Sequence, residues 1–225
     1  MKGAIVEFKV NGSNSKGYLA RPKKNTGKAV ILLQEWWGLV DHIKEVADRL
    51  ANEGFVVLAP DLYHGEVANS PTDAQKLAMA LQIDQVEKDL RGAVDYLLNL
   101  EAVTSAKVGI VGFCMGGALS LYSACINKKI GACIVYYGIR KDVENKLSSL
   151  EAPVLGFFGE LDKGVPVERV NQLDEEMKKA GKEHTFIVYP NANHAFFNDT
   201  RPAYDLKSAK DSWEKMIEFF NKRIK

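Results

Sequence analysis

Short runs rich in β-branched residues alternate with amphipathic stretches over most of this 225-residue chain. Runs of this kind are typical of buried parallel strands, and they cover residues 29–33, 55–60, 107–113, 130–136, 154–158 and 184–189. Between them, apolar residues recur at helical spacing, as at Ile43, Val46, Ala47 and Leu50. The alternation predicts an α/β fold with a doubly wound, mostly parallel sheet flanked by helices. An antiparallel pair from residues 5–10 and 17–21 should precede it.

The composition restricts the class of partner. Lys and Arg together number 30 and Asp and Glu 29, which leaves a net charge of +1 without a long run of either sign. A nucleic-acid partner is therefore not expected. No apolar stretch approaches the roughly 20 residues that a membrane helix needs, so no membrane partner is expected either.

Location and domain organisation follow from similar arguments. The first ten residues alternate apolar and charged side chains, unlike a signal peptide, and three cysteines do not form a disulfide framework. We expect a cytoplasmic protein with free thiols. No repeat or long polar linker divides the chain, so residues 1–225 are predicted to be one domain that is a monomer or a small homo-oligomer.

The segment Gly112-Phe113-Cys114-Met115-Gly116-Gly117 follows a predicted strand and opens a predicted helix. It is the G-x-S-x-G pattern of a nucleophile elbow, with cysteine in place of serine. Small neighbours allow the strained turn that lifts the nucleophile above the sheet, and the N–H groups of the following helix can stabilise a thiolate or an oxyanion. Phosphate binding is the alternative, but neither the Lys-Ser/Thr ending of a Walker motif nor a G-x-G-x-x-G fingerprint is present.

Asp162 and His194 each follow a later predicted strand, at residues 154–158 and 184–189. Considered alone, each is more typical of an ordinary loop residue than of a catalytic one. The chain order nucleophile, acid, histidine is the order that α/β-hydrolases use, and the carboxyl ends of parallel strands meet at one edge of a sheet. We therefore predict a triad of Cys114, Asp162 and His194.

The stretch Gln34-Glu35-Trp36-Trp37-Gly38 follows the strand after which this fold supplies its second oxyanion N–H, for which the backbone of Trp36 is the candidate. A charge between an apolar strand and two tryptophans should be held by a polar partner, and Glu35 could find one in the thiol. Cys125 and Cys133 lie in apolar elements and are read as core residues. No histidine has a partner at metal-ligand spacing, and no cofactor is predicted.

Taken together, these residues resemble the dienelactone hydrolase family, the cysteine-using branch of α/β-hydrolases that includes carboxymethylenebutenolidases. The resemblance runs through Q-E-W-W-G, A-P-D-L-Y-H-G, G-F-C-M-G-G, Y-Y-G, G-E-L-D-K-G-V-P and H-A-F, in order and spacing. It implies that the N–H groups of Trp36 and Met115 form the oxyanion hole and that Glu35 holds the resting cysteine. It also implies that Tyr137, Trp37 and Asn198 contact the substrate, a small ester or lactone.

Two positions depart from the family pattern. Dienelactone-cleaving members bind the substrate carboxylate with arginines, one of them four residues after the catalytic histidine, where this chain has Asn198. Residues 66–80 contain only Lys76 where the other arginine would stand. A carboxylesterase or thioesterase without dienelactone activity is therefore one alternative. A non-catalytic small-molecule receptor on the same fold and a thiol redox protein are the others.

Overall fold

The computed structural model describes residues 2–140 and 146–225. Contacts within the chain divide it into two compact units, residues 1–110 with 224–225 and residues 111–223. Strand β5 (Val108–Phe113) begins in the first unit and ends in the second. The prediction of one domain over residues 1–225 stays a prediction.

The first unit contains β1 (Ala4–Val10), β2 (Ser13–Ala20), β3 (Lys28–Leu33) and β4 (Phe55–Pro60), in the spatial order β1-β2-β4-β3-β5. β1 and β2 form an antiparallel hairpin, and β2 pairs antiparallel with β4. β3 and β4 are parallel. The hairpin turn is Asn11-Gly12, whose φ angles of 35° and 93° suit a tight turn between twisted strands. β2 therefore begins at Ser13 and not at the predicted residue 17, because pairing with β1 continues up to the turn.

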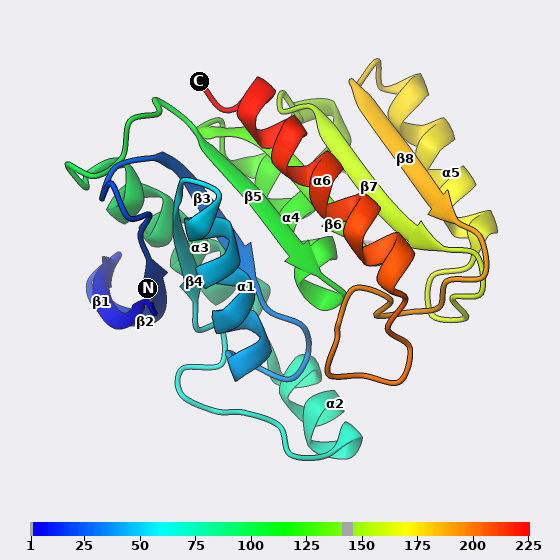
Figure 1. Ribbon diagram of the computed structural model, residues 1–225, viewed down its shortest axis with the longest axis horizontal. Helices are drawn as coiled ribbons and strands as arrows, with labels where there is room; N and C mark the ends of the chain where they lie inside the picture. Colours follow the sequence, from blue (N-terminus) through cyan, green and yellow to red (C-terminus); the bar gives the residue numbers. More distant parts are fainter. Residues whose placement is uncertain (1, 141–145) are drawn as a thin grey trace. The chain divides into compact units, whose positions relative to one another are not determined.

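Three helices complete this unit: α1 (Asp41–Asn52), α2 (Pro71–Ala80) and α3 (Ile83–Leu98). Figure 1 shows α1 in front of the strands and α3 behind them. The Ser70 hydroxyl accepts the N–H of Asp73 at 3.1 Å, and Pro71 occupies the first turn, where its missing N–H has no cost. Helix α2 thus begins at Pro71, directly after its N-cap residue Ser70.

The second unit contains β6 (Ile130–Tyr136), β7 (Val154–Gly159) and β8 (His184–Tyr189), in the order β5-β6-β7-β8. The pairs β6–β7 and β7–β8 are parallel. Its helices are α4 (Met115–Ile126), α5 (Val167–Lys179) and α6 (Leu206–Arg223). α6 lies in front of β6 and β7, and α4 lies behind (Figure 1). Such crossovers bring the loops after parallel strands to one edge of the sheet.

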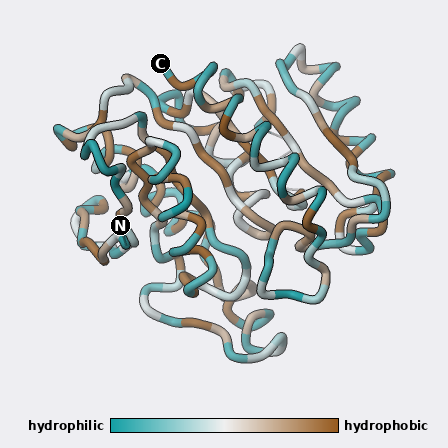
Figure 2. The backbone as a smooth tube through the Cα atoms, viewed as in Figure 1, coloured by the Kyte–Doolittle hydropathy of each residue, from teal (hydrophilic) through white to brown (hydrophobic). Residues whose placement is uncertain are grey.

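Burial follows the predicted pattern except in β8, which was predicted to be buried but lies at the edge of the sheet, where only its Tyr189 is buried. Every residue of β4, β5 and β7 is buried, whereas α1, α3, α5 and α6 bury one face only. Figure 2 shows this as brown strands beside helices that alternate brown and teal. The predicted α/β class, with a mostly parallel sheet between helices and antiparallel N-terminal strands, is confirmed. Among the described residues, no helix combines the length and apolar character needed to cross a membrane.

Candidate active site

Cys114 stands between β5 and α4 in a strained backbone conformation, with φ 54° and ψ −117°. Its N–H donates to the Tyr136 carbonyl at 3.0 Å, and its carbonyl accepts the N–H of Gly117 at 3.0 Å. A Cβ on Gly138 would lie 1.9 Å from the Cys114 carbonyl oxygen, so only glycine lets these two backbone segments approach. The half-buried cysteine therefore has the geometry expected of a nucleophile elbow.

Asp162 and His194 are joined by a short hydrogen bond, 2.7 Å from Oδ2 to Nδ1. The side chain of Asp162 is fully buried, whereas that of His194 is 34% exposed. The other carboxylate oxygen, Oδ1, accepts the N–H groups of Gly164 at 2.7 Å and Val165 at 2.9 Å. Three hydrogen bonds therefore hold Asp162 as a buried carboxylate that orients the imidazole.

Two loops that follow neighbouring strands hold this pair in place. The Leu161 N–H donates to the Ala192 carbonyl at 2.9 Å, and the Asn191 N–H donates to Glu160 Oε2 at 2.9 Å. Gly159 permits the approach, because a Cβ there would lie 2.6 Å from the Ala192 carbonyl oxygen. The loop after β7 and the loop after β8 are thus bound to each other through residues that shortly precede Asp162 and His194.

The electrostatics connect His194 with both neighbours. Burial alone would lower the pKa of His194, but hydrogen bonds and charge interactions with Asp162 and Cys114 outweigh it and raise this pKa to about 10. His194 thus interacts with two acidic partners, the carboxylate of Asp162 and the sulfur of Cys114.

The other two cysteines are buried free thiols. Burial raises the pKa of Cys125 to about 11, and it raises the pKa of Cys133 well above the ordinary value. Neither thiol has the environment of a nucleophile.

Three further predicted residues lie in the second unit. Tyr137 is fully buried, with a φ of 39°, and its ring centroid is 5.1 Å from that of His194. Met115 is the first residue of α4, where helix N–H groups attract negative charge. Asn198 is buried, and its Oδ1 accepts the N–H and the hydroxyl of Thr200 at 3.0 and 2.7 Å. That contact fixes a turn, and the role of Asn198 toward substrate stays a prediction.

Glu35, Trp36 and Trp37 follow β3 in the first unit. Glu35 is only 3% exposed, and the two indole rings meet edge to face at 5.4 Å. Their proposed roles toward the cysteine stay predictions from the family resemblance.

Sequence reasoning missed the residues that support this stretch. The buried side chain of Gln34 accepts the N–H of Leu62, and the Tyr63 hydroxyl donates to the Trp36 carbonyl. The A-P-D-L-Y-H-G motif contains Tyr63, but a motif alone does not disclose a partner 27 residues away.

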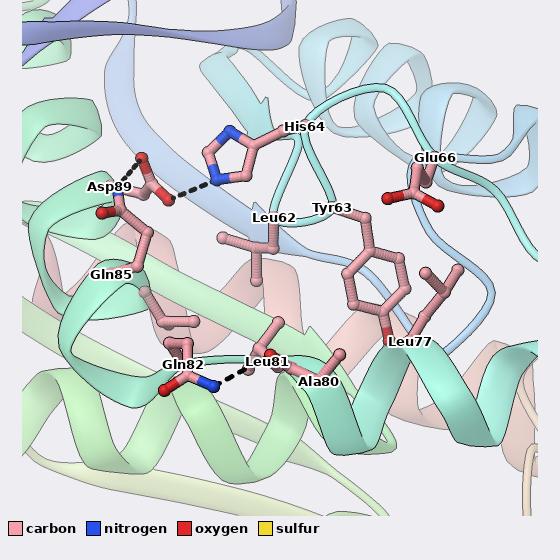
Figure 3. Close-up of a pocket in the computed structure, with 11 residues that line it drawn as sticks. Leu62, Tyr63, His64, Glu66, Leu77, Ala80, Leu81, Gln82, Gln85 and Asp89 are labelled. Atoms are coloured by element: carbon pink, nitrogen blue, oxygen red, sulfur yellow. Dashed lines mark hydrogen bonds and ion pairs between the residues drawn. The ribbon is translucent and has the colours of Figure 1, made fainter.

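The first unit also contains a cavity of about 190 Å³ beside α2 and α3 (Figure 3). At its edge, His64 Nε2 lies 3.2 Å from a carboxylate oxygen of Asp89, whose side chain is 2% exposed. None of the predicted site residues lines it. The chemistry of the site therefore rests on the elbow and the Asp162–His194 contact. No cluster of three or more metal-ligating side chains was found among the described residues.

The model of the dienelactone hydrolase family matches residues 15–224, nearly the whole chain. The chain belongs to the dienelactone hydrolase family. The predicted family is thus confirmed, together with the predicted enzyme class, a carboxylic ester hydrolase.

Individual relatives extend over the same length. The "Putative carboxymethylenebutenolidase" of Aquifex aeolicus is 35% identical over 231 residues, covering 99% of this chain and 100% of that protein. "Protein usf" of Aquifex pyrophilus is 36% identical over 230 residues, covering 99% of each. The crystal structure of the "Putative Dienelactone Hydrolase" of Klebsiella pneumoniae has a TM-score of 0.87 at 30% identity, covering 97% of this chain and 99% of that one.

Proposed function

We propose that this protein hydrolyses small esters or lactones through an acyl-enzyme on Cys114. The observation that carries the proposal is the 2.7 Å contact between His194 and the buried Asp162, with His194 also interacting with an elbow cysteine. These are the three roles of a hydrolytic triad, namely nucleophile, base and orienting acid.

In the proposed reaction, the Cys114 proton passes to His194 and the thiolate attacks the ester carbonyl. The N–H groups of Trp36 and Met115 stabilise the oxyanion, and the C–O bond breaks as His194 returns its proton to the leaving alcohol. Water, deprotonated by His194, then attacks the thioester, which releases the acid and restores the thiol. Asp162 keeps the imidazole oriented throughout. Neither a metal nor a cofactor enters these steps.

Glu35 is proposed to hold the resting Cys114 as a thiol and so to protect it between turnovers. Tyr137 and Trp37 are proposed to line the substrate pocket. All three cysteines are free, which supports a location in the reducing cytoplasm. The protein is proposed to act as a monomer or a small homo-oligomer.

The substrate is proposed to be neutral or weakly charged. Neither Asn198 nor the stretch 66–80 supplies the arginine that would bind a substrate carboxylate. A charge-assisted hydrogen bond contributes about 1.5–3 kcal/mol, so the loss of one arginine should weaken dienelactone binding about 10- to 150-fold relative to a family member that has it. A preference of the wild-type protein for dienelactone would contradict this part of the proposal.

The test compares wild type with Cys114→Ala and His194→Ala on a chromogenic ester of a short acyl chain. We expect both variants to lose turnover, and we expect a slow ester to give a burst whose acyl group is found by mass on Cys114. Cys125→Ala serves as the matched control and should retain turnover. Equal, measurable turnover by wild type and Cys114→Ala would refute the proposal. If wild type turned over no ester at all, a receptor on the same fold would be favoured.

A further inference from the structure

The stretch Gln34–Gly38 is held from one side by the turn that follows β4. The Tyr63 hydroxyl donates to the Trp36 carbonyl at 3.2 Å, and the Ala68 N–H donates to the Trp37 carbonyl at 3.0 Å. Gln34 Oε1 accepts the Leu62 N–H at 3.3 Å. Three residues of the stretch, Gln34, Trp36 and Trp37, thus have a partner in the segment from Leu62 to Ala68.

The packing at Gly38 shows how close the two segments are. Gly38 has a φ of 96°, and a Cβ there would lie 2.8 Å from the Glu66 carbonyl oxygen. The stretch therefore leaves β3 against the backbone of the turn, without room for a side chain at this point.

The turn is itself fixed by a buried carboxylate. Asp61 Oδ1 accepts the Tyr63 N–H at 3.1 Å, and Oδ2 accepts the Gly65 N–H at 2.7 Å. His64 has a left-handed φ of 52° and places its Nε2 beside Asp89 on α3. Figure 3 shows His64 directed toward Asp89, whereas the side chain of the preceding residue, Tyr63, points away from Asp89. Tyr63 is thus anchored at its backbone, and it is only 7% exposed.

We infer that Tyr63 is a positioning residue for the oxyanion N–H of Trp36. The inference rests on the proposed function, in which that N–H stabilises the negative charge of the tetrahedral intermediate. The Tyr63 hydroxyl fixes the Trp36 carbonyl, which follows the Trp36 Cα in the chain. The hydrogen bond with Leu62 fixes Gln34, which precedes Trp36. The Glu35–Trp36 peptide that bears the N–H lies between these two anchors, so its direction depends on both.

The predicted consequence is a change in transition-state stabilisation and not in substrate binding. An oxyanion donor acts on charge that develops only as the bond forms, and removal of such a donor costs about 10²- to 10³-fold in kcat. A displaced donor should cost less than a missing one. We expect Tyr63→Phe to lower kcat about 10-fold and to leave KM within about 2-fold of wild type.

Tyr18→Phe is the matched control. Tyr18 lies in the same unit with the same 7% exposure, and its hydroxyl donates to the Asp48 side chain at 3.0 Å. This variant should lose comparable stability and retain kcat. Active-site titration with a slow ester normalises both rates to the folded, acylatable protein.

A second variant changes the turn and leaves the Tyr63 hydroxyl in place. Asp61→Asn retains one acceptor oxygen and replaces the other with an N–H₂ group that cannot accept from Gly65 or Tyr63. It should lower kcat in the same direction by a smaller factor. Should Tyr63→Phe fail to fold, Asp61→Asn applies the same test.

A transition-state analogue supplies the second readout. A trifluoromethyl ketone forms an anionic tetrahedral adduct with the thiolate, whereas the matching methyl amide binds as a neutral ligand. We expect the affinity of Tyr63→Phe for the ketone to fall by the same factor as kcat/KM, with the affinity for the amide unchanged. Unchanged kcat per active site, or equal losses for ketone and amide, would overturn the inference.

Failure of the inference differs from failure of the proposed function. If wild type turns over esters and Tyr63→Phe matches it, only the positioning role is wrong. If wild type itself turns over no ester, the fluorine NMR signals of protein labelled with 5-fluorotryptophan still report the conformation of the Gln34–Gly38 stretch. The chain has three tryptophans, and Tyr63→Phe should shift the signals of Trp36 and Trp37 while that of Trp213 stays unchanged.

Discussion

His194 Nδ1 lies 2.7 Å from Asp162 Oδ2, although the two residues are 32 positions apart and follow different strands. The contact fixes which imidazole nitrogen carries the proton toward Asp162 and which one faces away from it. The same contact contributes to the raised pKa of His194.

Asp162→Asn should lower kcat by about 10⁴-fold and should also lower the free energy of unfolding near neutral pH, because the carboxylate contributes to the raised pKa of His194. The amide can still accept the N–H groups of Gly164 and Val165, but it no longer holds the imidazole in the productive tautomer. Ester turnover and urea unfolding of the two proteins check this. A variant with more than a tenth of the wild-type kcat would show that Asp162 does not orient the base.

The stability of the protein should depend on the ionisation of His194. Its folded pKa is raised to about 10 from an ordinary value near 6.5, so its contribution to stability is complete below pH 6.5 and is lost as the pH rises through 10. The difference in unfolding free energy between wild type and His194→Gln should therefore shrink from pH 6.5 to pH 10. Urea titrations across this range measure it, and a constant difference would contradict the raised pKa.

Alkylation should distinguish the three cysteines at pH 8. Cys114 is half-buried and interacts with His194, whereas Cys125 and Cys133 are 4% and 0% exposed and have raised pKa values. One equivalent of iodoacetamide should label Cys114, as peptide mass mapping will show. Urea-unfolded protein is the control and should label all three; labelling of Cys133 in folded protein would disprove the assignment.

Gly138→Ala should disturb the elbow through the backbone. Its Cβ would lie 1.9 Å from the Cys114 carbonyl oxygen and 2.7 Å from the Ala118 nitrogen, so backbone must move, at a cost of about 3 kcal/mol in unfolding free energy. Gly181→Ala is the control, since nothing lies within 4 Å and only its φ of 64° is strained, at about 1 kcal/mol. Only Gly138→Ala should also lower kcat per active site; equal stability losses would show that the elbow tolerates a side chain.

Glu35→Gln should raise the alkylation rate of Cys114 near neutral pH, if Glu35 opposes the thiolate as proposed. A nearby carboxylate disfavours a second negative charge, and the amide removes that repulsion. The pH profile of alkylation tests this, with Glu45→Gln on the exposed face of α1 as control. Superimposable profiles for wild type and Glu35→Gln would show that the Glu35 carboxylate and the Cys114 thiol do not interact.

The sequence by itself determined the strands, the elbow and the chemistry of its residues. Buried parallel strands read as apolar runs, so β4 and β6 begin and end at the predicted residues. The glycines around Cys114 predicted a strained turn, and a Cβ at Gly112 would lie 2.1 Å from the Gly116 carbonyl oxygen. Local sterics and hydrophobic periodicity act over a few residues, and the sequence displays them directly.

Tertiary structure alone decided the partners of these residues. No local rule specifies that Asp162 gives one oxygen to His194 and the other to the N–H groups of its own turn, or that Tyr63 reaches the Trp36 carbonyl. It also decided the raised pKa of His194, since that pKa depends on groups 32 and 80 positions away in the chain. Hydrogen bonds and charge interactions operate through distances of a few ångströms, and only the folded chain sets those distances.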